Sequence, residues 1–251
     1  MHSEISARKC VFVISHPRSG THLLIDFIRK NFREFDRKLK PWESASLVYV
    51  ALDRPSWREE IAMRLRDREE THFLLHSHYS GIVAATHLEA AEKLKPARAI
   101  FLYPFRRFST TIKSYAEFRQ FRGSIGSFLP AADDFFGLDA TVKKCVELHV
   151  EKWLQPDVHF VDTDRLALQP DIACSRLAEL FNEKPVERTQ RLPRRKWFGG
   201  RLGEFAERLT GRESSEFRVD YDIPWQGADE KVAVDQQFDA LYSELSARRI
   251  N

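Results

Sequence analysis

The stretch CVFVISHPRSGTHLLIDFIRKNF, residues Cys10–Phe32, decides the fold of this chain. It starts with a short apolar run over Cys10–Ser15, passes through a Pro-Arg-Ser-Gly-Thr turn, and continues over Thr21–Phe32 with apolar residues spaced as on one helix face. This order places the backbone N–H groups of Ser19–His22 at a helix N-terminus, where they lack helical partners and favour an anion. The stretch therefore predicts an anion-binding loop after a buried strand.

The side chains of this turn also suit an anion. Arg18 adds a cation whose fork matches phosphate oxygens, Ser19 and Thr21 add hydroxyl donors, and Gly20 allows close approach of the chain. The simpler interpretation is that Ser19 or Thr21 caps an ordinary helix. A Walker A loop would need Lys and then Ser or Thr after its last Gly, where this chain has Thr21 and His22, so chemistry with ATP and Mg²⁺ is disfavoured.

Three more short apolar runs, His72–His76, Ala99–Tyr103 and Val158–Asp162, have the composition of strands covered on both faces. Helical patterns lie between these runs, so we expect an α/β fold in which helices flank a central parallel sheet. We predict one domain over residues 1–251, with the motifs in residues 9–200, a C-terminal loop and helix over 201–251, and a lid at 123–137. The predicted helices are Thr21–Phe32, Trp57–Arg68, Val83–Leu94, Ser109–Phe118, Thr141–Trp153 and Asp171–Phe181.

Composition narrows the function classes. The net charge of +3 is too small for the basic stripe of a nucleic-acid-binding protein, but it suits a small anionic ligand. Cys10, Cys145 and Cys174 are widely spaced and form no CxxC pair, which argues against a disulfide framework or structural zinc and for a reducing compartment. No apolar run is long enough for a signal peptide or a membrane span, so we expect a cytoplasmic protein without stable membrane insertion.

The segment PRSGTHLL resembles the 5′-phosphosulfate-binding loop of bacterial-type sulfotransferases, which is commonly Pro-Lys/Arg-Ser-Gly-Thr-Thr. The resemblance implies a P-loop NTPase-like sulfotransferase fold, the sulfuryl donor PAPS (3′-phosphoadenosine 5′-phosphosulfate) and no metal. It also implies that Arg18, Ser19, Gly20, Thr21 and His22 cradle the 5′-phosphosulfate. Arg18 stands where many members have Lys, and His22 replaces a frequent Thr.

The second strand, in the text HFLLHSHYSG, resembles a family strand that ends in Lys-Thr-His. The resemblance makes His78 the catalytic base and puts His76 at the Lys position. Imidazole titrates near neutral pH, so it can accept the proton that an acceptor hydroxyl loses as it attacks sulfur. Two other interpretations stay open: a pair of metal ligands, and ordinary hydrogen-bonded histidines at a strand end.

The text IFLYPFRRFSTTIKSYAEF resembles the family's 3′-phosphate motif, in which an Arg after a strand is followed by a Ser eight residues later. Arg106 and Ser114 have this spacing. Another register would put Tyr103 and Thr111 in these places. We prefer Arg106 and Ser114 because a phosphate favours a cation.

The text RRKWFGGR resembles the family's C-terminal Arg-Lys-Gly-x-x-Gly loop, which closes on the 3′-phosphate. Arg195, Lys196 and Gly200 match it, and Trp197 takes the place of the first Gly. Taken alone, this segment would be interpreted as a surface charge run. The residues Asp164–Leu166 resemble the family's Glu-Asp-Leu segment, which we interpret as structural.

Together these motifs predict a sulfotransferase that moves a sulfuryl group from PAPS to a hydroxyl or amine. Its acceptor would be a small molecule, a glycan or a lipid, with walls from Lys40–Trp57 and the aromatic stretch Phe118–Phe136. One alternative is a Mg²⁺-dependent nucleotide phosphotransferase with Asp162 or Asp164 as metal ligand. Another is a non-catalytic nucleotide- or anion-binding module. The sequence makes no prediction of the oligomeric state.

Overall fold

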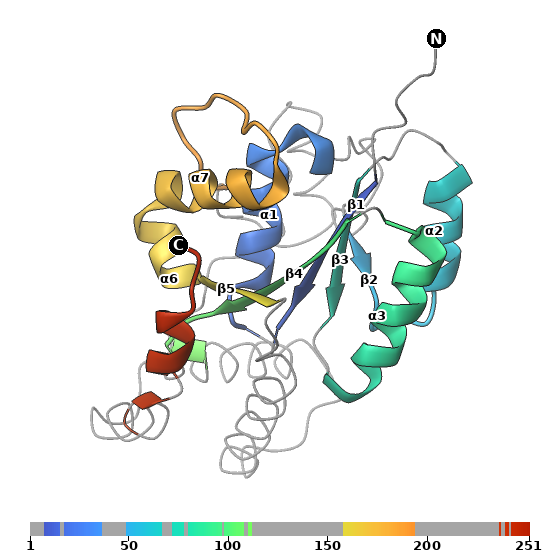
Figure 1. The fold of residues 1–251 in the computed structure, drawn as a ribbon, viewed down its shortest axis with the longest axis horizontal. Coiled ribbons are helices and arrows are strands. Elements are labelled where there is room, and N and C mark those ends of the chain that lie inside the picture. Colours follow the sequence, from blue (N-terminus) through green and yellow to red (C-terminus); the bar gives the residue numbers. More distant parts are fainter. Residues whose placement is uncertain are drawn as a thin grey trace, which may run out of the picture.

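A computed structural model describes residues 8–15, 18–36, 49–66, 72–77, 80–96, 98–107, 110–111, 158–193, 236, 239–240 and 242–251. Within these residues a five-stranded sheet has the order β2-β3-β1-β4-β5, and every neighbouring pair is parallel (Figure 1). The prediction of an α/β fold with a central parallel sheet is therefore confirmed. The strands are β1 (Lys9–Ile14), β2 (Val50–Ala51), β3 (His72–Ser77), β4 (Arg98–Phe105) and β5 (Val158–Asp162).

Strand β1 lies at the centre of the sheet. Its Val13 pairs with His76 of β3 on one side and with Leu102 of β4 on the other. The connection that leaves β1 runs toward β2 at one edge of the sheet, whereas the connections that leave β3 and β4 run toward β5 at the other edge, so the winding direction changes at β1. In open α/β sheets ligands bind outside the carboxyl ends of the strands at such a point. The predicted anion-binding loop follows β1 directly and thus lies at this position.

Two strands differ from the sequence prediction. Strand β2 has only Val50–Ala51, which is too short to give a sequence pattern. Strand β4 continues past the predicted end at Tyr103, through Pro104 to Phe105. Its pairing with β1 stops at Leu102, and beyond that residue only β5 is its partner. The strand is therefore locally an edge, where a residue without a backbone N–H is tolerated.

Helices cover both faces of the sheet (Figure 1). One buried apolar cluster joins α1 and α7 to one face, and a second joins α2 and α3 to the other. Strand residues alternate between the clusters, as the two-residue period of a strand requires: Val11 and Val13 belong to the first, Phe12 and Ile14 to the second. The helical bounds are α1 Thr21–Asn31, η1 Arg33–Phe35, α2 Trp57–Arg66, α3 Ser80–Leu94, α6 Thr163–Leu168 and α7 Pro170–Phe181.

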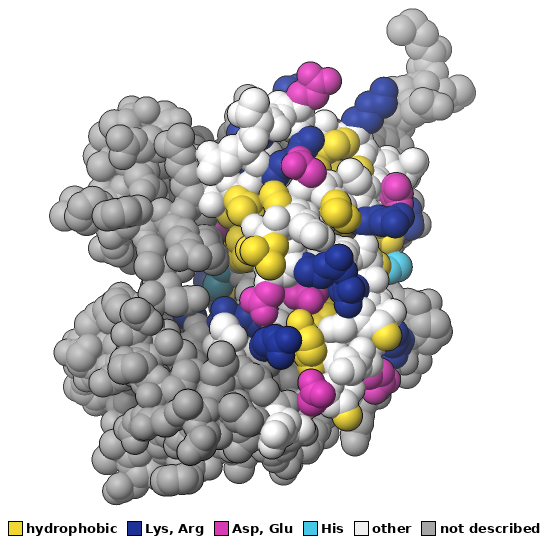
Figure 2. Space-filling view, turned by 90° about the vertical axis from the view of Figure 1, so that its left-hand side faces the viewer, with side chains coloured by type: hydrophobic (Ala, Val, Ile, Leu, Met, Phe, Trp, Pro, Cys, Tyr) yellow, Lys and Arg dark blue, Asp and Glu magenta, His cyan; other side chains and the backbone are white. Residues whose placement is uncertain are grey.

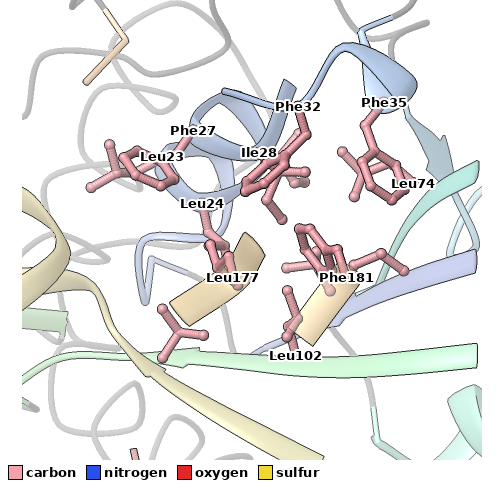
Figure 3. Packing of buried hydrophobic residues seen from close by; sticks show 14 of the residues in the cluster. Leu23, Leu24, Phe27, Ile28, Phe32, Phe35, Leu74, Leu102, Leu177 and Phe181 are labelled. Carbon is pink, nitrogen blue, oxygen red and sulfur yellow. The ribbon is translucent and has the colours of Figure 1, made fainter. Parts of the chain in front are cut away.

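Packing of α1 fixes the helix that follows the predicted loop. Figure 3 shows Leu24 and Ile28 directed toward Leu177 and Phe181 of α7, above Leu102 of β4. All five side chains belong to the same buried cluster. A buried aliphatic or aromatic side chain contributes roughly 1.5–3 kcal/mol. The N-terminus of α1 is therefore held against the sheet by the helix's own core face.

Several predicted elements lie wholly or partly outside the described residues. Helix Thr141–Trp153 and the lid at 123–137 lie outside entirely, and of helix Ser109–Phe118 only the helical residues 110–111 are described. In the C-terminal part, residues 242–247 are helical, as expected for the tail. The division into one domain over 1–251 stays a prediction.

The last described residues extend the sheet beside β5. The backbone N–H of Ile250 donates to Phe160 O at 2.9 Å. The side-chain amide of Asn251 pairs with the backbone of Asp162 in both directions, at 2.9 Å for Asp162 N–H to Asn251 Oδ1 and 2.8 Å for Asn251 Nδ2 to Asp162 O. This pairing holds the carboxyl end of β5 in place.

On the face shown in Figure 2, hydrophobic, basic and acidic side chains intermingle over the described surface. The large hydrophobic residues exposed in the described part are Met63, Leu168 and Ile172. None of the helices in that part combines the length and the apolar character needed to cross a membrane.

Candidate functional site

The loop after β1 has an unusual backbone. Arg18 has φ 69° and Gly20 has φ 94°, so two left-handed residues stand on either side of Ser19. A left-handed conformation is costly for an arginine, and such residues are concentrated at functional sites. Left-handed residues at the start of a helix also turn successive backbone N–H groups toward one concave surface, which is an anion-binding arrangement. This loop leads into α1 at Thr21.

The simple helix-cap interpretation does not describe this loop. The N-cap of α1 is Gly20, and no side chain caps the helix. The Thr21 hydroxyl instead forms a buried hydrogen bond with the Ser15 hydroxyl. Ser19 is 0% exposed, and its hydroxyl has no hydrogen-bond partner within the described structure. A buried hydroxyl without a partner costs about 1–3 kcal/mol, which a ligand oxygen could offset.

Thr163 ties this loop to the end of β4. It is the first residue of α6, and its hydroxyl lies 2.9 Å from Ser19 O and 3.0 Å from Phe105 O. Its side chain also fills the space beside Gly20, because a Cβ added at Gly20 would lie 2.5 Å from Thr163 Oγ1. Gly20 thus meets two requirements at once, a positive φ and close contact with Thr163. The loop after β1 and the turn after β4 are neighbours.

Arg106 follows the last residue of β4 and is partly exposed at the same edge of the sheet. Beside it, the backbone N–H of Arg107 donates to Asp164 Oδ2 at 3.3 Å. Burial raises the pKa of the Asp164 carboxyl above its ordinary value, while the Arg107 N–H and the Arg106 charge act in the opposite direction. The structure therefore brings Arg106 to the edge that holds Arg18 and Ser19.

The other register for the 3′-phosphate motif involves two buried residues. Tyr103 lies inside β4 at 1% exposure, and its ring packs edge-on against Phe160 at 5.7 Å between centroids. Thr111 is 0% exposed, and its hydroxyl donates to Arg107 O at 3.3 Å. Of the two candidates for the first position of this motif, Arg106 is the one outside the strand.

His76 belongs to a group of three rings beside the loop. Its ring centroid lies 5.8 Å from that of His22 in α1 and 5.4 Å from that of Tyr49, which precedes β2. His22 and Tyr49 are 5.9 Å apart. The group brings two imidazoles, from α1 and β3, and the phenol that precedes β2 to the carboxyl edge of the sheet. These groups can donate and accept protons and hydrogen bonds.

Asp162 serves the backbone of the β5–α6 corner. Its Oδ1 accepts from the N–H of Asp164 at 3.0 Å and of Arg165 at 3.1 Å, and this caps α6. Its Oδ2 accepts from the Tyr242 hydroxyl at 3.3 Å. Burial, followed by the Asp162 charge, raises the pKa of Tyr242 above its ordinary value. Both carboxylate oxygens are therefore engaged in structural hydrogen bonds.

Five predicted site residues lie outside the described part of the chain, and their roles stay predictions: His78, Ser114, Arg195, Lys196 and Gly200. The structure brings the others together at one edge of the sheet. Within the described ranges, no group of three or more His, Cys, Asp and Glu residues could hold a metal ion.

Sequence reasoning missed Thr163 and Tyr49. Thr163 follows β5 directly, and a polar residue at the carboxyl end of a parallel strand is a usable signal. The sequence analysis assigns the next residues, Asp164–Leu166, a structural role and considers Asp162 or Asp164 as a metal ligand, so it passes over Thr163 between them. Tyr49 lay inside the predicted acceptor wall Lys40–Trp57 but had no feature that distinguished it from other aromatic residues.

No family model matches this sequence, and no curated protein sequence matches it. Among solved structures, the chain is similar to the sulfotransferase domain from the olefin synthase of Synechococcus PCC 7002, with TM-score 0.47 and 13% identity over 93% of this chain and 95% of that one. It is also similar to mouse sulfotransferase SULT7A1 complexed with PAP, with TM-score 0.47 and 12% identity over 94% of this chain and 84% of that one. We infer the function from the residues of the site.

Proposed function

We propose that this protein is a sulfotransferase that moves a sulfuryl group from PAPS to a hydroxyl or amine acceptor. The observation that carries the proposal is the loop after β1. There the fully buried Ser19 hydroxyl, without a partner in the described structure, stands between left-handed Arg18 and Gly20 at the N-terminus of α1. Helix N-termini and arginine both favour bound anions. The 5′-phosphosulfate of PAPS is the anion that this loop would hold.

The motifs also suggest which other residues would contact PAPS. Thr21 and His22 would offer the backbone N–H groups of the first turn of α1, because the Thr21 hydroxyl is already bonded to Ser15. Arg106 would meet the 3′-phosphate at the neighbouring end of β4. Its proposed partners there are Ser114, Arg195, Lys196 and Gly200.

PAPS would supply the sulfuryl group, and the residues of this chain would handle the charges and the proton. As the acceptor oxygen bonds to sulfur, its proton passes to His78, and the bond from sulfur to the phosphate oxygen breaks to release PAP. Arg18, His76 and the N–H groups of the loop stabilise the negative charge that grows on the phosphate. Stabilisation of this kind acts most strongly in the transition state.

The Mg²⁺-dependent phosphotransferase receives less support from the contacts. In a P-loop enzyme, a lysine and a hydroxyl residue follow the last glycine, and this chain has Thr21 and His22 in those places. Both oxygens of Asp162 bind the α6 backbone or Tyr242, and Asp164 accepts from Arg107 N–H. A non-catalytic anion-binding module would share the loop but would have no need of His78.

The acceptor and the compartment are part of the proposal. We assign a small-molecule, glycan or lipid acceptor, bound beside the ring group of His22, Tyr49 and His76. We also place the protein in the cytoplasm and without nucleic-acid partners. Cys10 and Cys174, the described cysteines, are free and buried, which supports a reducing compartment, and burial raises the pKa of the Cys10 thiol to about 12.

The experiment measures the binding of PAP and the turnover of PAPS. We expect PAP to raise the melting temperature, 5′-AMP to do little, and PAPS to be converted to PAP when a suitable phenol, sugar or lipid acceptor is added. Arg176→Ala, which removes an exposed arginine of α7, should keep the PAP response. Equal responses to PAP and 5′-AMP would refute the assignment of a 3′-phosphate site.

A further inference from the structure

We propose that Thr163 is a positioning residue that sets the separation of the two phosphate-binding halves of the donor site. This inference rests on the proposed function. The loop of Arg18 and Ser19 follows β1, whereas Arg106 follows β4, and the two segments come from different parts of the chain. Thr163 contacts both of them, so it is placed to control how far apart they stand.

The hydroxyl of Thr163 makes the first connection. It lies 2.9 Å from Ser19 O and 3.0 Å from Phe105 O, and Thr163 is 3% exposed. A hydroxyl has one hydrogen to donate, so the two carbonyl oxygens share it or exchange it. The carbonyl of Ser19 belongs to the peptide bond with Gly20 in the loop after β1, and the carbonyl of Phe105 belongs to the peptide bond with Arg106. One hydroxyl therefore holds the backbone next to both proposed phosphate contacts.

The carbon atoms of Thr163 make the second connection. A Cβ at Gly20 would lie 2.7 Å from Thr163 Cβ and 2.8 Å from Thr163 Cγ2, so the glycine backbone packs directly against this side chain. The first loop cannot move toward α6 without meeting Thr163. The hydroxyl resists separation of the loop from α6, and the carbon atoms resist closer approach.

Neighbouring residues fix Thr163 itself. Asp162 caps α6 through the N–H groups of Asp164 and Arg165, and Asn251 pairs with the Asp162 backbone. Asp164 accepts from Arg107 N–H at 3.3 Å, a second connection between this corner and the turn after β4. These hydrogen bonds hold the β5–α6 corner in place, so Thr163 can keep the two segments that it contacts at a fixed separation.

A spacer of this kind would matter most for a ligand with two anionic ends. PAP must reach both halves at once, whereas 5′-AMP needs only the loop after β1. A misplacement of about 1 Å in a catalytic group can cost as much as a hundredfold in rate, and we expect misplaced phosphate-binding groups to lose affinity for the same geometric reason. Loss of the spacer should therefore weaken PAP much more than 5′-AMP. A residue that supported the fold alone would change both affinities together.

The test compares Thr163→Val and Thr163→Ser by calorimetric titration with PAP and with 5′-AMP. Valine keeps the shape but removes the hydroxyl, and serine keeps the hydroxyl. We expect the ratio of the two dissociation constants, 5′-AMP over PAP, to fall about tenfold or more in Thr163→Val. In Thr163→Ser the ratio should stay within about threefold of wild type.

A stability control separates positioning from general loosening. Asn31→Ala removes three side-chain hydrogen bonds at the far end of α1. Asn31 Nδ2 donates to Phe27 O at 2.8 Å and to Arg191 O at 3.0 Å, and Asn31 Oδ1 accepts from Arg191 Nη1 at 3.4 Å. This variant should lose stability but keep the wild-type ratio. If wild type itself shows no preference for PAP, the proposed function fails. If wild type prefers PAP and Thr163→Val keeps that preference, the positioning role alone is refuted.

Discussion

Thr163 packs so closely against Gly20 that a methyl group on Gly20 would lie 2.5 Å from Thr163 Oγ1. Gly20 also has φ 94°, a backbone conformation that other residues adopt only under strain. The loop after β1 and the start of α6 are therefore in direct backbone-to-side-chain contact. This contact makes the loop sensitive to any side chain at position 20.

Gly20→Ala should destabilise the protein, since alanine brings both the strained φ and the clash with Thr163. We expect a loss of about 1–3 kcal/mol in the free energy of unfolding. Chemical denaturation measures this loss. The control Ser175→Ala, on the exposed face of α7, should change stability by no more than about 0.5 kcal/mol. Wild-type stability in Gly20→Ala would show that the loop has room to relax.

Arg18 should strengthen PAP binding through its charge while its left-handed backbone conformation lowers the stability of the fold. Arg18→Ala and Arg18→Gly both remove the cation, so both should bind PAP at least about tenfold more weakly. They differ in the backbone, because glycine accepts φ 69° without strain. We therefore expect Arg18→Gly to be more stable than Arg18→Ala by about 0.5–1 kcal/mol, measured by denaturation. An alanine variant as stable as the glycine variant would contradict the left-handed conformation.

The elements that the sequence predicted best are those with long or buried apolar patterns. Strand β5, Val158–Asp162, has the predicted bounds, and α1 begins at the predicted Thr21. Both have a hydrophobic pattern long enough to outweigh local preferences. The position of the loop after β1 is also predicted correctly. The end of the buried strand and the start of the amphipathic helix both show in the sequence, and the loop must lie between them.

The features that the sequence did not predict depend on tertiary contacts. Strand β2 has two residues and is defined only by its pairing with β3. Pro104 would normally end a strand, but β4 loses its β1 partner after Leu102 and tolerates it. The role of Thr163 needs Ser19 and Phe105 to be neighbours, and no local pattern encodes that contact.

Removal of divalent metal should leave the activity unchanged. In the described structure Asp162 uses both carboxylate oxygens in bonds to the α6 backbone and Tyr242, and Thr21 bonds Ser15. The residues that would bind Mg²⁺ in a P-loop enzyme are thus engaged elsewhere or replaced. The measurement is the rate of PAP formation from PAPS before and after EDTA. Loss of activity that Mg²⁺ restores would favour the phosphotransferase.

His72 should make the fold less stable in mild acid. Burial lowers the pKa of His72 below its ordinary value of 6.5, although Glu183, 3.5 Å away, raises it in part. The folded state therefore binds fewer protons than the unfolded state between the two pKa values. The contribution of His72 is fully present above pH 6.5 and is lost as the pH falls toward the lower folded pKa.

The variant His72→Gln removes this titration. Melting temperatures measured at pH 7.5 and pH 5.5 should differ less in His72→Gln than in wild type, whatever the absolute stability of the variant. Other groups titrate in both proteins and cancel in the comparison. An equal or larger decrease in the variant would show that folding does not lower the pKa of His72.

His78 is the last residue to test, as the proposed base after the carboxyl end of β3. His78→Ala should lower kcat by roughly 10²–10⁴-fold, because the proposed base that takes the proton from the acceptor hydroxyl is then missing. PAP affinity should stay close to that of wild type, because the proposed base would act on the acceptor and not on the nucleotide. Arg18→Ala should differ by weakening PAP binding and turnover together, since its charge meets the phosphate in both ground and transition states.

His72→Gln serves as the matched control, because it removes a histidine at the opposite end of the same strand. At pH 7.5 it should keep both kcat and PAP affinity. His76→Ala should fall between the control and His78→Ala if His76 stabilises the leaving phosphate. A His78→Ala enzyme with near-normal turnover would remove His78 from the mechanism. The base would then be sought in the ring group, where the ring centroids of His22 and His76 lie 5.8 Å apart beside the loop after β1.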